Sequence, residues 1–262
     1  MSDTPWIAPE RLDVVWFSGT DALRFLNDLI SQELGDMAPG QTRRSFLLEP
    51  QGKLRFLLWV VRDDDRIGLI TDEGRGAELD AALSRYRIRV DVEIEPETQE
   101  VWVVVGDWEG YDVSWPDVSR RLVIGDRPDL ERGDPAEYER LRVTAGVPRW
   151  GVDVDEGTIP HESGLVPVSV DFSKGCFLGQ ELVARIDSRG GNTPRNLLLL
   201  QTDGETRPGD RVTVDAVEVG VVTSATSGAA LAMLKRSVAV GDVVEVGGAR
   251  AVVNDLPVKS SG

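Results

Sequence analysis

Short apolar segments bounded by turn residues recur in the first half of the chain and predict β-strands, and one of them, residues 88–95, alternates apolar and polar residues. These segments cover residues 12–19, 44–61, 67–71, 88–95 and 101–107. A tight turn at Pro50–Gly52 divides the second segment into two strands. The first half of the chain is therefore predicted to supply the strands of one or more sheets.

Helical periodicity interrupts these strands. Apolar residues recur every three to four positions over residues 21–34, which Gly35 ends, and over residues 73–86. A third helix is predicted from Pro135, because proline is favoured in the first helical turn. Residues 107–133 are rich in Gly, Pro and Asp and predict irregular structure. The order of elements is not a regular β-α-β series, so we predict an α+β fold with mixed or antiparallel sheets.

The pattern changes near Pro194. After this residue valine and glycine alternate with polar residues, and helical periodicity is almost lost. Short strands separated by turn signals at about 8 to 12 residues are typical of a small antiparallel β-barrel. We therefore predict two domains, residues 1–194 and residues 195–262.

Charge narrows the classes of partner. The 262 residues include 45 acidic and 29 basic side chains, for a net charge of −16. Such a surface repels nucleic-acid phosphates and anionic lipids, so we expect neither direct nucleic-acid binding nor a membrane partner. The simplest role for the excess of acid is solubility.

The chain contains one cysteine and one histidine, and these small numbers restrict the kinds of metal site it can form and the cellular compartment it suits. One cysteine cannot form an internal disulfide, and one cysteine with one histidine cannot build a usual structural zinc site. A carboxylate-rich magnesium or calcium site is the remaining alternative, but no acidic loop has a recognisable ligand spacing, so we predict no metal site. The chain starts without the basic and apolar regions of a signal peptide, and no apolar run is long enough to span a membrane. The expected location is the cytoplasm.

The single cysteine, Cys176, lies in the stretch SKGCFLGQELVARIDSRGG. Lys174 precedes it by two residues, and a predicted helix begins shortly after it. A nearby cation and a helix N-terminus both favour the thiolate. Gly175 and Gly179 would let the backbone approach a ligand closely. Two interpretations stay open: a functional thiol, or a small buried hydrophobic residue.

Other candidate residues have similar alternatives. Gln180, Glu181 and Arg185 share a helix; the two charged residues form either a surface pair or part of a polar ligand site. His161 is a conceivable base for Cys176 in a cysteine hydrolase, or a solvated loop residue. Seven tryptophans are many for this length, and one or two of them are candidates to line a flat aromatic ligand site.

The segment KGCFLGQE resembles the signature of the YgfZ-type folate-binding proteins. The stretches LRVTAGVPRWGVD and TIPHESGL before it, the first helix, the hairpin LLEPQGKLRFLLWV and the C-terminal RPGD…VGVVTSAT are also similar to this family and to the related glycine-cleavage T protein. The resemblance covers nearly the whole chain. It implies an N-terminal body with a central channel for tetrahydrofolate or another reduced folate, and then a C-terminal barrel.

The resemblance also implies a function and its residues. It implies an accessory role in maintaining iron–sulfur enzymes, including one that modifies tRNA, with transient contacts to iron–sulfur proteins. It implies Cys176 as the functional thiol. The residues that it implies for the folate site are Lys174, Gly175, Phe177, Gly179, Gln180, Glu181, Arg185 and Arg142.

The hairpin departs from the T protein. There aspartates follow the hairpin glycine, whereas here Gly52 is followed by Lys53, Leu54, Arg55 and Phe56. Proton transfer at a folate nitrogen needs a positioned acid or base, so a folate-dependent one-carbon transferase is the alternative rather than the leading hypothesis. Arg55 and Lys53 are candidates to meet the anionic folate tail, or are simply exposed.

Overall fold

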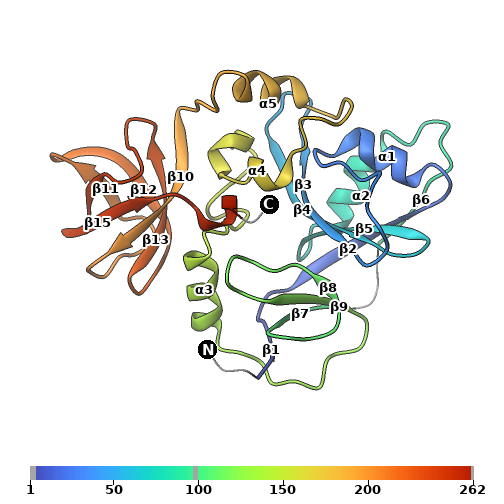
Figure 1. Cartoon of the computed structure of the whole chain (residues 1–262), viewed down its shortest axis with the longest axis horizontal. Coiled ribbons are helices and arrows are strands. Elements are labelled where there is room, and N and C mark those ends of the chain that lie inside the picture. The colour runs from blue at the N-terminus through green and yellow to red at the C-terminus, as the bar shows by residue number, and fades with distance from the viewer. Residues whose placement is uncertain (1–3, 97–99, 261–262) are drawn as a thin grey trace.

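The computed structural model describes residues 4–96 and 100–260 of the chain. Figure 1 shows two sheets, a barrel and a group of short helices arranged around a common centre. The fold is α+β with mostly antiparallel strands and ends in a closed six-stranded barrel, which confirms the predicted fold class. None of the helices within the described residues is both long and apolar enough to cross a membrane.

A five-stranded antiparallel sheet has the strand order β3-β4-β5-β2-β6. Its strands are β2 (Leu12–Ser18), β3 (Thr42–Leu48), β4 (Leu54–Arg62), β5 (Arg66–Asp72) and β6 (Glu93–Pro96). Helices α1 (Ala22–Leu29) and α2 (Gly76–Ser84) cover one face and bury a cluster with it. The opposite face turns towards the centre of the molecule, because successive side chains of a strand point to opposite faces.

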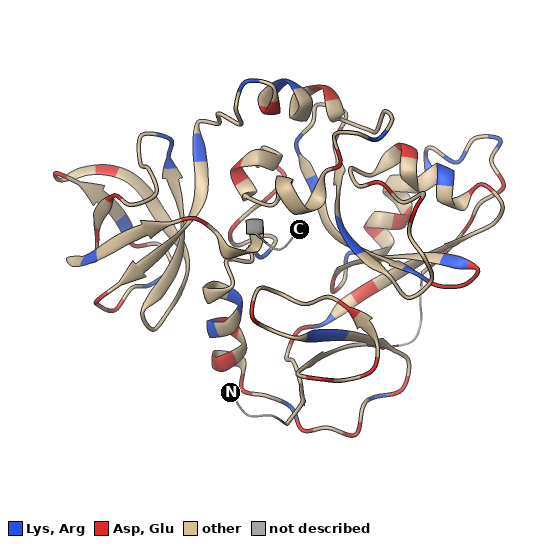
Figure 2. Ribbon diagram, viewed as in Figure 1, with Lys and Arg blue, Asp and Glu red and all other residues tan. Residues whose placement is uncertain are grey.

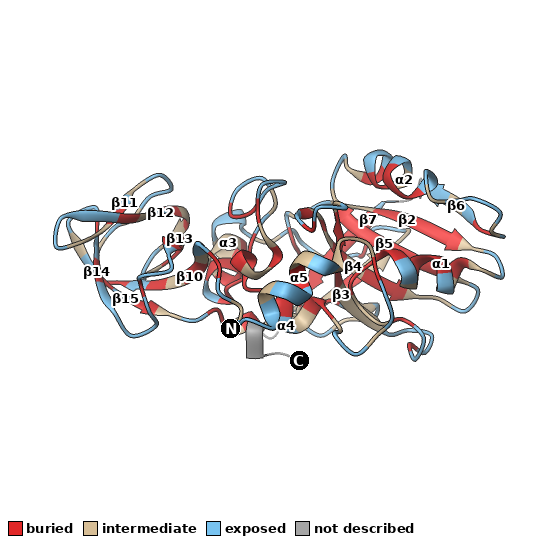
Figure 3. Ribbon diagram, turned by 90° about the horizontal axis from the view of Figure 1, so that it is seen from above, coloured by how far each residue is buried: buried red, intermediate tan, exposed pale blue. Residues whose placement is uncertain are grey.

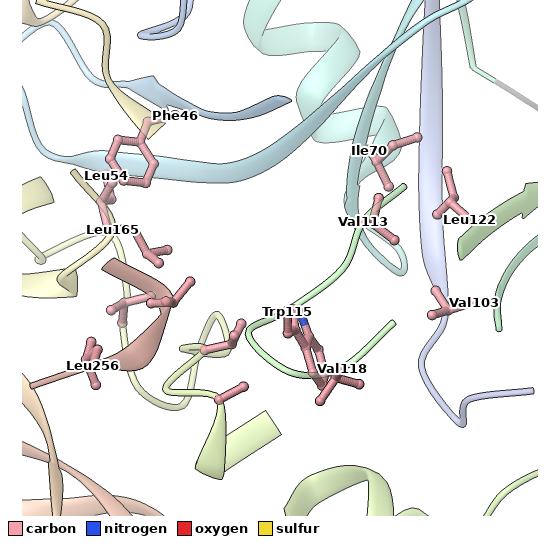
Figure 4. Packing of buried hydrophobic residues seen from close by; sticks show 14 of the residues in the cluster. Phe46, Leu54, Ile70, Val103, Val113, Trp115, Val118, Leu122, Leu165 and Leu256 are labelled. Carbon is pink, nitrogen blue, oxygen red and sulfur yellow. The ribbon is translucent and has the colours of Figure 1, made fainter. Parts of the chain in front are cut away.

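A four-stranded antiparallel sheet, in the order β1-β7-β9-β8, packs near that opposite face. Its strands are β1 (Trp6–Ile7), β7 (Val101–Val105), β8 (Tyr111–Asp112) and β9 (Arg120–Ile124). Figure 4 shows the shared core: Ile70 from the larger sheet lies near Val103 and Leu122 from the smaller one, while Phe46 lies with Leu54 and Leu165. The two sheets are thus joined by one buried apolar cluster.

The barrel closes in the order β10-β13-β12-β11-β14-β15. Its strands are β10 (Arg195–Thr202), β11 (Arg211–Val214), β12 (Val217–Thr226), β13 (Ala229–Lys235), β14 (Val243–Val246) and β15 (Ala249–Asn254). A separate apolar cluster fills it. After β15 the chain leaves the barrel, and Leu256 and Val258 are buried in the cluster shared by the two sheets. Figure 4 shows Leu256 within that cluster.

Short helices connect these parts. They are α3 (Pro135–Thr144), the 3₁₀ helix η1 (Pro160–Ser163), α4 (Val166–Ser169), α5 (Gln180–Asp187) and the 3₁₀ helix η2 (Pro257–Ser260). Helix α3 begins as predicted: Pro135 occupies its first turn, and the Asp134 side chain accepts a hydrogen bond from the Ala136 backbone N–H. Figure 3 shows that the outer side of α5 is exposed.

Three local predictions were wrong. The first helix ends at Leu29 rather than near Gly35, because Ile30 becomes extended and the next residue donates its N–H to Phe46 of β3. The strand predicted over 88–95 is confined to Glu93–Pro96. The segment predicted to be irregular, 107–133, contains β8 and β9, which pair with each other, and β9 also pairs with β7.

Candidate functional site

A cavity of about 610 Å³ lies between the two sheets and α3; we call it the central cavity. Its lining residues come from seven parts of the sequence. They are Pro9–Leu12, Arg44–Phe46, Leu57–Trp59, Ile70–Asp72, Val113, Trp115, Arg120, Pro135, Tyr138, Glu139, Arg142, Val147–Trp150, Leu165 and Ser169. A volume of this size is within the usual range for small-molecule sites.

Aromatic side chains form much of the cavity wall. Trp59, Trp115, Trp150 and Tyr138 all line it. The rings of Trp115 and Tyr138 lie 5.1 Å apart at an angle of 40°. Flat walls of this kind suit a flat heterocyclic ligand, which can stack on them.

A buried polar cluster occupies one part of the cavity wall. The Arg120 guanidinium, 2% exposed, donates to the Glu10 carboxylate and also to the Tyr138 hydroxyl at 2.9 Å. Tyr138 donates its own hydroxyl proton to Glu10. The guanidinium also lies 3.8 Å from the Trp115 ring. Burial raises the pKa of Tyr138 well above its ordinary value, so the hydroxyl stays protonated and acts as a donor.

Arg44 has the least compensated charge of the cavity wall. It lies opposite Trp59 in the β3–β4 pairing, and its guanidinium is 4.3 Å from that indole ring. Its Nη2 is buried without a hydrogen-bond partner. Burial, and secondarily the nearby Arg120, lowers the pKa of Arg44 to about 9. The group remains cationic at neutral pH, although its surroundings disfavour the charge.

Asp72, at the end of β5, adds a carboxyl group to the same wall. Burial raises its pKa, and the carboxylate of Glu10 raises it further, while Arg75 and Arg149 oppose the shift. The cavity therefore contains one carboxyl group whose proton is held more tightly than usual.

Arg142 lines the cavity but is committed to the protein. It is 4% exposed and donates to Glu139, to the Val147 carbonyl, to Asp153 at 2.8 Å and to the Ser224 hydroxyl of β12 at 2.6 Å. These bonds join α3 to the barrel. The ligand role predicted for Arg142 stays a prediction, and its guanidinium is already saturated by protein acceptors.

The Cys176 loop lies outside the central cavity. Cys176 and Gly175 are exposed, and neither lines the cavity. The Lys174 ammonium donates to the carbonyls of Asn27, Ile30 and Gln32 at 2.6 to 2.9 Å, which fastens the loop to the end of α1. Burial lowers the pKa of Lys174 to about 8. The functional role of the thiol stays a prediction.

The other motif residues hold the loop against the sheet. Phe177 is buried in the shared core, and its N–H donates to the Gln180 side chain at 3.1 Å. Gly179 has φ +77°, and a Cβ there would lie 2.5 Å from the Glu49 carbonyl oxygen. Gly52 of the β3–β4 turn would meet Leu182 of α5 at the same distance. Glycine is required at both positions because the start of α5 and the β3–β4 turn lie in close contact there.

The charged candidates on α5 and the hairpin also lie away from the cavity. Glu181 and Arg185 are exposed on α5, and no ion pair between them is present among the described residues. Arg55 pairs with Glu49 at 3.3 Å, and Lys53 donates to the Gly157 carbonyl. Their predicted contacts with a folate stay untested, and none of these four residues lines the central cavity.

His161 does not form a pair with the thiol. Its imidazole is buried beside Asp187 at the C-terminal end of α5, 3.8 Å from that carboxylate, and neither ring nitrogen has a hydrogen-bond partner. Cys176 precedes the other end of this eight-residue helix, which is roughly 12 Å long. Burial lowers the pKa of His161, so the ring is neutral. The arrangement gives no support to a cysteine hydrolase.

The sequence is similar to those of several known proteins. No family model matches the chain. It is 28% identical to the mitochondrial iron–sulfur cluster assembly factor IBA57 homolog of Cryptococcus neoformans, over 70% of this chain and 63% of that protein. It is 24% identical to the tRNA-modifying protein YgfZ of Edwardsiella ictaluri, over 73% and 69% of the two chains. The chain thus spans less than two thirds of the fungal relative.

The chain is a homologue of the YgfZ and IBA57 proteins. This relation confirms the predicted resemblance to the YgfZ-type proteins. The crystal structure of the glycine cleavage system aminomethyltransferase T from Bartonella henselae matches 97% of this chain and 86% of its own, with a TM-score of 0.85 and 16% identity. The YgfZ and IBA57 homologue therefore has the T-protein fold.

Sequence reasoning missed most of the cavity wall. Glu10, Arg44, Asp72, Arg120 and Tyr138 belong to no motif and are scattered over the chain. One signal was present: Arg44 shares the apolar phase of β3 with Phe46 and Leu48, both buried. An arginine in the buried phase of a strand indicates a polar site within the core.

Proposed function

We propose that this chain binds a reduced folate in the central cavity and supports the assembly or maintenance of iron–sulfur proteins. The single observation that carries the proposal is the cavity, of about 610 Å³ and walled by Trp59, Trp115 and Trp150, in a homologue of YgfZ and IBA57. A pterin ring is flat, has polar edges and fits such walls. The Glu10–Arg120 pair supplies an acceptor and donors for those edges.

The relatives support the iron–sulfur part of the proposal. The fungal relative is described as an iron–sulfur cluster assembly factor, and the bacterial one as a tRNA-modifying protein. We connect the two through an iron–sulfur enzyme that acts on tRNA, because a net charge of −16 opposes direct binding of RNA. Acidic residues are spread over the barrel, the sheets and the helices (Figure 2). The proposed setting is a reducing compartment such as the cytoplasm.

Cys176 is proposed to act on the protein partner rather than on the folate. It is exposed on a loop fastened to α1 by Lys174, and Phe172 of the same loop is 45% exposed. One cysteine supplies at most one protein ligand to a cluster, so a transient contact with an iron–sulfur protein suits it better than permanent cluster binding.

Calorimetric titration with tetrahydrofolate tests the pocket. We expect one site, and Trp59→Ala should weaken binding by about tenfold or more, since stacking on an aromatic ring contributes about 1–3 kcal/mol. Trp108→Ala is the matched control, because Trp108 lies in a turn and does not line the cavity. Absence of binding, or equal losses in the two variants, would contradict the proposed pocket.

A cellular test separates the thiol from the pocket. In a strain that lacks its own copy of the gene, the Cys176→Ala variant should fail to restore the activity of an iron–sulfur enzyme, while the purified variant binds tetrahydrofolate as the wild type does. Full restoration by this variant would remove the thiol from the proposal.

A folate-dependent one-carbon transferase is the second candidate function. One observation favours it: Asp72 brings a carboxyl group with a raised pKa to the cavity wall, although no carboxylate follows Gly52 in the hairpin. Such a group is suited to proton transfer. Turnover of methylene-tetrahydrofolate with an amine acceptor, lost in Asp72→Asn, would favour the transferase; no turnover by the wild type would exclude it.

A further inference from the structure

A second cavity, of about 420 Å³, adjoins the central one. Arg44 and Trp59 line both cavities, so this stacked pair forms the boundary between them. The remaining wall of the second cavity is largely polar and includes Gln32, Thr42, Ser114 and Arg43. It also contains two carboxylates: Asp36 is paired with Arg43, and Asp171 accepts hydrogen bonds from Ser173. A ligand that occupies the central cavity and is longer than one ring system can therefore continue past Arg44 into a polar space.

Arg44 differs from every other arginine of these walls. Arg120 pairs with Glu10, Arg142 with Asp153 and Glu139, and Arg149 with Glu139. Arg11 lies 3.8 Å from Glu73, and Arg43 of the second cavity lies 2.7 Å from Asp36. Within residues 4–96 and 100–260, no ion pair includes Arg44, and its Nη2 is buried without a partner.

Arg44 is half-buried, and a cation with a buried nitrogen and no ionic partner is costly unless an anion meets it. The cause lies in the strand itself: the pleat of β3 turns Arg44 to the same face as Phe46, towards the interior, where stacking on Trp59 holds it. Glu10, the acid that raises the pKa of Arg44, already accepts hydrogen bonds from Arg120 and Tyr138. The guanidinium is thus positioned and has unused donor capacity.

We propose that Arg44 binds a carboxylate of the ligand, and that the second cavity receives the carboxylate-bearing tail of a molecule whose flat ring lies in the central cavity. This inference rests on the proposed function, since a reduced folate has both parts. A guanidinium binds a carboxylate through two parallel hydrogen bonds, which gives specificity as well as affinity. Arg55 and Lys53, the candidates that the sequence offered for the tail, line neither cavity.

The experiment compares two ligands on three proteins by calorimetry. The ligands are tetrahydrofolate and its diamide, in which both glutamyl carboxyls are neutral amides. The proteins are the wild type, Arg44→Met and Arg66→Met. Arg66 is the matched control, because it also stacks on a tryptophan, 3.9 Å from the ring of Trp16, but lines neither cavity.

We expect Arg44→Met to weaken tetrahydrofolate binding by about tenfold to a hundredfold, the usual effect of losing hydrogen bonds to a charged group. The wild type should lose a similar factor with the diamide. Arg44→Met should bind the diamide about as well as the wild type does, which also verifies that the variant is folded. Arg66→Met should resemble the wild type with both ligands.

Two results would overturn the inference while leaving the proposed function intact. One is equal affinity of the wild type for tetrahydrofolate and its diamide. The other is an equal loss for both ligands in Arg44→Met. If the wild type binds neither ligand, the proposed function fails and this inference fails with it.

Discussion

Removal of the buried guanidinium of Arg142 tests whether α3 and the barrel are held together as the structure indicates. Arg142 makes five hydrogen bonds, of which one reaches Ser224 in the barrel and another reaches Asp153. The Asp153 side chain is fully buried and also accepts from the hydroxyls of Thr223 and Ser224. The variant Arg142→Met preserves most of the side-chain volume and removes the charge.

The expected loss follows from what the variant leaves behind. Breaking a buried ion pair by removing one partner costs about 3–5 kcal/mol, because the other charge stays buried. The Asp153 carboxylate keeps three donors, two hydroxyls and the Arg149 backbone N–H, so we expect the lower end of that range. The free energy of unfolding should therefore fall by about 3 kcal/mol.

Urea unfolding, followed by tryptophan fluorescence and by circular dichroism, measures this loss. The matched control is Arg140→Met, two residues earlier on α3, whose ion pair with Glu137 is exposed on both sides. An exposed pair contributes about 0–1 kcal/mol, so this variant should unfold almost as the wild type does. Equal stabilities of the two variants would refute the assignment of Arg142 as the buried link.

Three further predictions concern the cysteine motif. Gly179→Ala should lower the free energy of unfolding in urea by about 2 kcal/mol or more, because it adds a Cβ at positive φ and against the Glu49 carbonyl. The control Gly175→Ala has open space around it and should be nearly neutral, and equal effects of the two substitutions would contradict the close contact. Between about pH 8 and pH 10.5 the unfolded chain binds more protons at Lys174 than the folded one. The free energy of unfolding of the wild type, relative to that of Lys174→Met, should therefore rise with pH across this window, and a difference that does not change with pH would exclude the lowered pKa. Cys176 should react with iodoacetamide in the native protein at nearly the rate seen in urea, since it is exposed; strong protection in the absence of ligand would show that the loop is covered.

The fold was predictable from the sequence where one physical signal dominated locally. Short apolar runs bounded by turn residues identified β2 to β5, and proline after aspartate identified the start of α3. The signals failed where tertiary pairing decided the outcome. Residues after Leu29 are apolar at helical spacing, yet Ile30 pairs with Leu47 of β3 instead of extending α1. Strand β9 lies in a segment rich in turn formers and exists because β7 offers it an edge.

The cavity was harder to predict than the fold. Its walls combine residues as far apart as Glu10 and Ser169, and no short motif joins them. The motif that the sequence did present, around Cys176, positions a loop on the surface: Lys174 and Gly179 serve local packing. The cysteine motif therefore located the exposed thiol, while the central cavity could be found only from the three-dimensional arrangement of the two sheets.

The return of the chain from the barrel to the shared core has a consequence for engineering. Residues 195–254 form the barrel, and the chain then returns to the two sheets, where Leu256 and Val258 are buried in the shared apolar cluster. The barrel is therefore connected to the rest of the protein on both sides in sequence, before β10 and after β15, and is not a simple C-terminal extension. A chimera that exchanges barrels between relatives must therefore match both connections. A chimera that replaces everything after Pro194 also removes Leu256 and Val258 from the apolar core that the two sheets share.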